Sequence, residues 1–198
     1  MSECLITFIE EASRLSSPRV LELGTKRSRR NRSTLHKAWV PHAGEYLGTD
    51  FQSGEDVNIV GDLHSLSKLT GESRFDIVIS CSTLEHVQYP WLAVEEISRI
   101  LSLNGLIAVQ THHAFPLHAY PQDYWRYTTE ALSALFCVQA GFQVLGTSYD
   151  FKSHLFSWRR PWMIRHTCYL NSYLVARKIA DLPGNFNWRD CLESVHDS

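Results

Sequence analysis

The sequence predicts an α/β protein whose mainly parallel β-sheet is covered by helices on both faces. Short apolar runs alternate with segments of helical periodicity. Polar groups follow the apolar runs directly, as at the carboxyl edge of such a sheet. The chain has 198 residues and is 44% hydrophobic, which suits one domain with a real core. No repeat, low-complexity tract or linker divides it.

The strands are expected where apolar runs end in turn-forming or polar residues. Before the first of them, Leu5, Phe8 and Ala12 recur at helical spacing, so residues 2–16 are predicted to form an amphipathic helix. The expected strands are 19–24, 45–50, 57–62, 75–80, 105–111, 142–147 and 169–178.

Three further helices are expected between the strands. Residues 36–43 are predicted to be the end of one helix. Pro90 suits the first turn of a second helix, which Asn104-Gly105 would end. Thr128 or Thr129 would cap a third helix running to Phe136. Residues 150–168 are aromatic and basic without a clear period.

Composition excludes several classes of protein. The formal net charge of −2 gives no global attraction to nucleic acid, so nucleic acid is an unlikely partner. No apolar run is long enough for a transmembrane segment, and the acidic N-terminus does not resemble a signal peptide. Five scattered cysteines without a CxxC pair indicate a reducing, cytoplasmic location.

Two aspartates carry the sharpest functional signal. Asp50 ends the second strand, where a carboxylate can accept both hydroxyls of a ribose. Asp62 ends the third strand, where it can meet the exocyclic amine of adenine while Leu63 packs on the ring. Gly24 lets the backbone approach a ligand. The alternative is that both aspartates are ordinary turn acids. Their occurrence at successive strand ends favours a nucleoside site.

Four segments resemble class I S-adenosylmethionine-dependent methyltransferases of the small-molecule, type 11-like group. These are VLELG, YLGTD, VGDLH and FDIVISCSTLEHVQYPWLAVEEISRILSLNGLIAV, and the similarity runs from Arg19 to Phe142. The resemblance implies a Rossmann-like three-layer sandwich with a seven-stranded, mostly parallel sheet whose last strand, YLVARK, is antiparallel. One domain is expected, with an N-terminal helix (1–17), a core (19–178) and a loose tail (179–198).

By this resemblance the cofactor is S-adenosylmethionine. The expected cofactor-binding residues are Glu22, Leu23, Gly24, Thr25, Asp50, Asp62, Leu63, His64, Cys81 and Ser82. Lys26 stands where the family usually has a second glycine. The cofactor has no phosphate, so Glu22 would help neutralise its ammonium group and Lys26, or the following helix, would meet its carboxylate.

A basic run follows the first strand. It consists of Lys26, Arg27, Arg29, Arg30, Arg32 and Lys37. A solvated loop is the first interpretation, a clamp for an anionic substrate the second, and an RNA-binding strip the last.

Residues 111–127 follow the fifth strand and are rich in histidine and aromatic residues. His112 and His118 are candidates for a general base, since histidine titrates near working pH. Each could instead be an ordinary hydrogen-bonded loop residue. No metal site is expected, because no cysteine or regular ligand spacing accompanies them.

Two more candidates lie in the same loop. Tyr124 either packs in the core or faces the sulfonium. Arg126 either pairs with Asp123 or grips a substrate carboxylate. Residues 151–166 would line the acceptor pocket or form a contact in a possible homodimer; a peripheral membrane role ranks last.

The predicted function is therefore methyl transfer from S-adenosylmethionine to a small-molecule acceptor. Two alternatives remain open. One is attack on the aminocarboxypropyl group, by transfer or cyclisation, with release of methylthioadenosine. The other is a non-catalytic module that retains only the fold.

Overall fold

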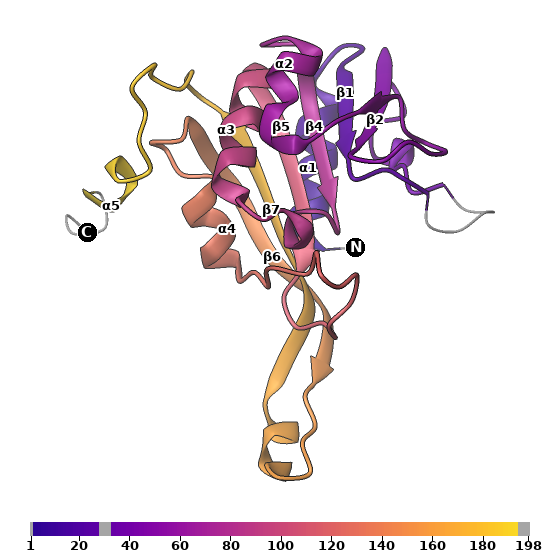
Figure 1. The fold of residues 1–198 in the computed structure, drawn as a ribbon, viewed down its shortest axis with the longest axis vertical. Coiled ribbons are helices and arrows are strands. Elements are labelled where there is room, and N and C mark those ends of the chain that lie inside the picture. The colour runs from indigo at the N-terminus through magenta and orange to yellow at the C-terminus, as the bar shows by residue number, and fades with distance from the viewer. Residues whose placement is uncertain (1, 28–32, 194–198) are drawn as a thin grey trace.

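The computed structural model describes residues 2–27 and 33–193 (Figure 1). Its centre is a seven-stranded sheet with the order β3-β2-β1-β4-β5-β7-β6. The strands are β1 (Arg19–Leu23), β2 (Glu45–Asp50), β3 (Ile59–Val60), β4 (Phe75–Cys81), β5 (Leu101–His112), β6 (Phe142–His154) and β7 (Thr167–Lys178). Strands β1 to β5 pair in parallel, and β7 is antiparallel to both β5 and β6. The predicted sheet with its antiparallel last strand is confirmed.

Helices cover both faces of this sheet and complete the three layers (Figure 1). Helix α1 (Glu3–Ser13) packs on one face, where Phe8 and Ala12 join a core cluster with Ile77 and Ile79 of β4. The other face carries α2 (Leu66–Thr70), α3 (Pro90–Ile100) and α4 (Thr129–Leu135).

The helix starts follow their capping signals. The Ser2 hydroxyl accepts a hydrogen bond from the Leu5 amide at 3.3 Å, and the Thr128 hydroxyl accepts one from the Ala131 amide at 3.0 Å. Pro90 occupies the first turn of α3, as predicted. The presence and the starts of these three helices are therefore confirmed, and α1 ends earlier than expected.

Two helix predictions are wrong. Residues 36–43 contain only a three-residue 3₁₀ turn (Lys37–Trp39), because Pro41 cannot continue a helix and the chain turns into β2. Helix α3 ends at Ile100, not at Asn104-Gly105. The strand begins at once, and Asn104, with φ of 66°, lies where the pairing of β5 with β4 shifts register.

The segment without a clear period forms the outer part of a β-hairpin. Strands β6 and β7 pair as far as His154 and Thr167, and a 3₁₀ turn (Pro161–Arg165) lies at the tip. The hairpin projects from the body of the molecule (Figure 1). Its tip exposes apolar side chains such as Phe156, Trp158 and Trp162.

The C-terminal segment is partly docked. Phe186 and Trp188 pack against the larger core cluster, and the Trp188 indole donates to Glu95 at 2.8 Å. Helix α5 (Asp190–Glu193) follows. Among the described helices, none combines the length and the apolar character that crossing a bilayer requires.

Candidate functional site

A cleft of about 390 Å³ opens at the carboxyl ends of β1, β2 and β4. Its walls come from the segments that follow β1, β2, β3 and β4 at that edge and from the loop after β5. The lining residues are Gly24, Asp50, Phe51, Asp62, Leu63, His64, Ser82, Thr83, His86, Val87, Gln88, Ala119, Gln122 and Tyr124. Six of the ten expected cofactor residues are thus brought together around one cavity, and Tyr124 of the four catalytic candidates joins them.

Gly24 forms the turn at the end of β1. Its φ is +69°, a left-handed conformation that favours glycine, and an added Cβ would lie 2.2 Å from the Thr83 hydroxyl. That hydroxyl is held at 3.1 Å from the Leu23 carbonyl oxygen and 2.9 Å from that of Cys81. The glycine is therefore required by the close approach of the two loops.

Asp50 points its carboxylate at the cleft from the end of β2. One oxygen accepts a hydrogen bond from the Lys26 amide at 3.1 Å, and the other accepts one from the Gln52 amide at 3.0 Å. Each carboxylate oxygen has a further lone pair. The backbone thus fixes the side chain without using up its capacity to accept.

Asp62 caps a short turn and also lines the cleft. It caps a 3₁₀ turn (Leu63–Ser65), and one of its oxygens accepts from the His64 amide at 2.9 Å and faces His64 Nδ1 at 2.6 Å. Partial burial acts to raise the pKa of Asp62. The His64 contacts outweigh burial and keep that pKa below its usual range. The carboxylate is ionised at neutral pH, and its side chain is 67% exposed.

The other four expected cofactor residues lie beneath the cleft rather than on its wall. Glu22 is buried and accepts hydrogen bonds from the His36 amide at 2.9 Å and the Tyr46 hydroxyl at 2.5 Å, with His36 Nδ1 at 2.6 Å. The pKa of Tyr46 is raised well above its usual value, mainly because the hydroxyl is buried and secondly because the negative Glu22 carboxylate lies beside it. Glu22 therefore anchors the loop after β1. The remaining three, Leu23, Thr25 and Cys81, are also mostly enclosed.

The described residues of the basic run make contacts within the protein. Arg27 pairs with both oxygens of Asp56 at 3.0 Å, and the Lys26 ammonium contacts Gln52. Lys37 lies 5.5 Å from the centre of the Tyr46 ring. Lys26 and Lys37 are exposed, as a solvated loop requires, and the contacts of Lys26 and Arg27 are internal, which does not support a substrate clamp at these two residues. The rest of the run, Arg29, Arg30 and Arg32, lies outside the described residues.

The loop after β5 folds back over the cleft. The amides of Tyr124 and Trp125 donate to the Glu85 carbonyl oxygen at 2.9 and 3.1 Å. Nδ1 of His86 faces the Gln122 carbonyl oxygen. The start of the loop is attached to the hairpin, because the His113 amide donates to the Leu170 carbonyl oxygen at 2.8 Å.

Arg126 does not face the cleft. Its guanidinium binds both oxygens of Asp123, at 2.6 and 2.9 Å, and donates to the carbonyl oxygens of Phe115 and Pro116. Arg126 is the main reason that the pKa of Asp123 is lowered. Of the two interpretations of Arg126, the internal pair is the one present, and it fixes the shape of the loop.

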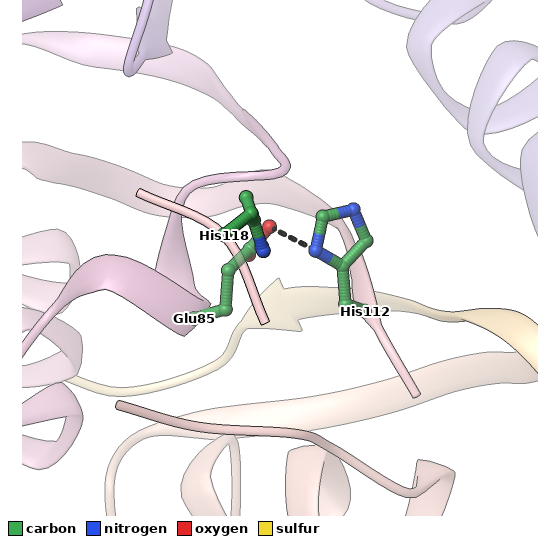
Figure 2. A group of neighbouring side chains, drawn as sticks. All are labelled: Glu85, His112 and His118. Carbon is green, nitrogen blue, oxygen red and sulfur yellow. Dashed lines mark ion pairs between the residues drawn. The ribbon is translucent and has the colours of Figure 1, made fainter. Parts of the chain in front are cut away.

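His112 and His118 lie beyond the cleft wall, on the side of His86. His112 is buried, and its ring stacks on Phe115 with centroids 4.0 Å apart. The His118 ring contacts the rings of His112 and His86 at 4.9 and 4.8 Å. Figure 2 shows both histidines beside the Glu85 carboxylate, with a dashed line from the carboxylate to His112.

Several lining residues were missed because they do not end a strand. Thr83, Val87 and Gln88 belong to the segment between β4 and α3, and Phe51 directly follows Asp50. An aromatic residue next to the ribose-type aspartate was the available signal for Phe51. Nothing in the local pattern distinguishes Ala119 or Gln122.

Comparison with known proteins agrees with this architecture. Residues 34–109 match the family model of a methyltransferase domain. A comparison with curated protein sequences finds no match.

Solved structures share the fold at low identity. One is a Burkholderia thailandensis 1,6-didemethyltoxoflavin-N1-methyltransferase with 1,6-didemethyltoxoflavin and S-adenosylhomocysteine bound (17% identity, 89% of this chain and 77% of that chain, TM-score 0.61). Another is an S-adenosylmethionine-dependent methyltransferase from Mesorhizobium loti (16% identity, 87% and 95%, TM-score 0.60). A third is the [4+2]-cyclase SpnF (15% identity, 89% and 80%, TM-score 0.60).

Proposed function

Because residues 34–109 match a methyltransferase domain and the chain has the class I methyltransferase fold, we propose that this protein transfers the methyl group of S-adenosylmethionine to a small-molecule acceptor. The observation that carries the proposal is the convergence of Asp50, Asp62 and Gly24 on one cleft at the carboxyl edge of the sheet.

The proposed cofactor pose follows from the chemistry of the walls. The free lone pairs of Asp50 accept the two ribose hydroxyls, and Asp62 accepts the adenine amine while Leu63 packs on the ring. The methionine part lies along the Gly24 turn, where the backbone approaches without a side chain. A cavity of about 390 Å³ lies in the range typical of small-ligand sites.

Methyl transfer is a direct displacement at an already electrophilic carbon. The protein has to align the acceptor with the S–CH₃ bond and exclude water. The loop that contributes Ala119, Gln122 and Tyr124 to the cleft covers this end of the site, which supports an acceptor of small size. His112 and His118 lie on the same side, beyond His86.

The test is calorimetric titration with S-adenosylmethionine. Asp50→Asn and Asp62→Asn are each expected to weaken binding by about tenfold or more. In each variant a neutral amide replaces a carboxylate that accepts a hydrogen bond from the cofactor. Asp150→Asn, in β6 and outside the lining of the cleft, is the matched control and is expected to bind as the parent does. Equal affinity in all four proteins would exclude this site.

A second candidate reaction has a specific observation behind it. A protein with this fold is a [4+2]-cyclase, so the fold alone does not set the reaction, and Lys26 replaces a glycine in the loop expected at the methionine end. Mass spectrometry of the nucleoside product separates the two reactions. S-adenosylhomocysteine supports methyl transfer, and methylthioadenosine supports attack on the aminocarboxypropyl group. Binding with neither product supports a non-catalytic module.

The cytoplasmic location and the homodimer stay predictions.

A further inference from the structure

Beyond the cofactor cleft, we propose that Glu85, His112 and His118 form a binding site for a divalent transition-metal ion. Their candidate ligand atoms all lie within 4.8 Å of one another. Three different segments supply them: the 3₁₀ turn after β4 (Leu84–His86), the end of β5, and the loop beyond it (Figure 2). This site replaces the sequence-based expectation that no metal is bound.

Two buried polar atoms in the cluster lack a hydrogen bond. Glu85 Oε1 lies 2.9 Å from His112 Nδ1 as an ion pair and 4.0 Å from His86 Nε2, but within residues 2–27 and 33–193 neither Glu85 Oε1 nor His112 Nδ1 has a partner with the geometry of a hydrogen bond. The side chains are 0% and 9% exposed. Burying polar atoms without a hydrogen bond is unfavourable. A cation that binds both atoms removes that cost.

The surrounding contacts orient the three ligands. The other oxygen of Glu85 accepts a hydrogen bond from the Thr111 hydroxyl at 2.6 Å. His118 Nδ1 lies 3.2 Å from the Pro116 carbonyl oxygen, so this nitrogen is the donor and Nε2 carries the lone pair. The His118 amide donates to Asp123, which Arg126 holds in turn. Ligands fixed by outer partners in this way are typical of metal sites.

The ligand set indicates the kind of ion. Two imidazoles and one carboxylate suit Zn²⁺, Co²⁺ or Fe²⁺ better than Mg²⁺ or Ca²⁺, which prefer oxygen ligands. Three protein ligands leave at least one coordination position open. A second candidate group, His86, His118 and Asp123, is weaker because Arg126 already occupies both oxygens of Asp123.

The site adjoins the proposed acceptor end of the cleft. His86 lines the cleft, and its Nε2 lies 4.0 Å from Glu85 Oε1. If the proposed methyl transfer is correct, the open position takes an oxygen of the acceptor, and this step alone depends on the proposed function. For a hydroxyl acceptor, the cation would lower the pKa of the bound hydroxyl, whose proton would pass to water before the cofactor closes the site. The acceptor oxygen would then form the O–CH₃ bond as the S–CH₃ bond breaks and S-adenosylhomocysteine leaves.

The experiment is titration of chelator-treated protein with Co²⁺, followed by visible absorption. The parent is expected to bind one equivalent with the intense bands of a four- or five-coordinate ion, and Zn²⁺ is expected to displace it. His118→Ala, in an exposed loop, and Glu85→Gln, which keeps the acceptor for Thr111, are each expected to bind at least about tenfold more weakly, the loss that even an outer-shell partner produces.

His154→Ala is the control, because it removes a histidine from the hairpin and not from the cluster. Binding of Co²⁺ by the parent that His118→Ala leaves unchanged, or no binding below about millimolar Co²⁺, would overturn the proposal. Calorimetry keeps the two proposals apart. Metal-free His118→Ala is expected to bind S-adenosylmethionine normally, and Asp50→Asn is expected to lose the cofactor while binding Co²⁺ as the parent does.

Discussion

At the scale of single residues, the turn at Gly24 is the most constrained point of the cleft. Gly24→Ala forces a methyl group against Thr83 and places a non-glycine residue at a φ of +69°. Either Thr83 or Gly24 has to move, and both line the cleft. We expect cofactor affinity to fall at least about tenfold, with a stability loss of about 1–3 kcal/mol.

Gly184→Ala is the matched control for this change, because no atom lies within 4 Å of its added Cβ. Titration calorimetry and urea denaturation of both variants provide the measurement. Gly24→Ala with the affinity and stability of Gly184→Ala would mean that the two loops are free to separate.

The expected site residues form two groups: some are positioned by the strand that they follow, and others by contacts with residues distant along the chain. Asp50 ends β2 and Asp62 follows β3, which is shorter than predicted (Ile59–Val60), so the sequence pattern alone brings both to one edge of the sheet. Glu22 also ends a strand, but its direction is set by His36 and Tyr46, which lie 14 and 24 residues away along the chain. No local pattern contains that information. The Asp123–Arg126 pair is only three residues apart, but its alternative was open because the path of the loop, which also places Phe115 and Pro116 beside Arg126, has no sequence period.

At the scale of elements, helices and strands were predicted correctly where burial of one face gives the sequence a regular spacing of apolar residues. Buried strands such as β4 and β5 and the amphipathic helices α1 and α3 were anticipated. The outer hairpin was not, because strand pairing holds it rather than the core, and both faces of its tip are exposed. Residues 36–43 were predicted to be the end of a helix, whereas Pro41 and the Glu22 contacts set the path of this loop.

The hairpin tip is expected to be dispensable for the cleft. Replacing residues 155–166 by an Asn-Gly turn removes exposed side chains, none of which lines the cavity. The melting temperature is expected to stay within about 3 °C of the parent, since surface changes alter stability by roughly 0.5 kcal/mol or less. Cofactor affinity is expected to be unchanged. A loss of affinity of tenfold or more in a folded variant would mean that the tip contributes to the site.

At the scale of the whole molecule, the cleft joins the ends of β1, β2 and β4 to the loop after β5, so a ligand in it links distant parts of the chain. A ligand that binds only the folded state at 100 times its dissociation constant adds about 2.7 kcal/mol of stability. For a chain of this size that corresponds to a rise in melting temperature of roughly 5–10 °C.

Scanning fluorimetry with and without S-adenosylmethionine measures this rise. Asp50→Asn under the same conditions is the control and is expected to show a much smaller rise. An identical rise in both proteins would assign the stabilisation to another part of the surface.

The attachment of the β5 loop to the hairpin has a mechanical consequence. The His113 and Ala114 amides bond to carbonyl oxygens of β7 at 2.8 and 3.1 Å, and the His113 ring contacts Tyr149 of β6. The backbone that carries His112 is therefore continuous with a long two-stranded arm. We therefore expect a displacement of the far end of that arm to shift the backbone next to His112 through the hydrogen bonds of His113 and Ala114.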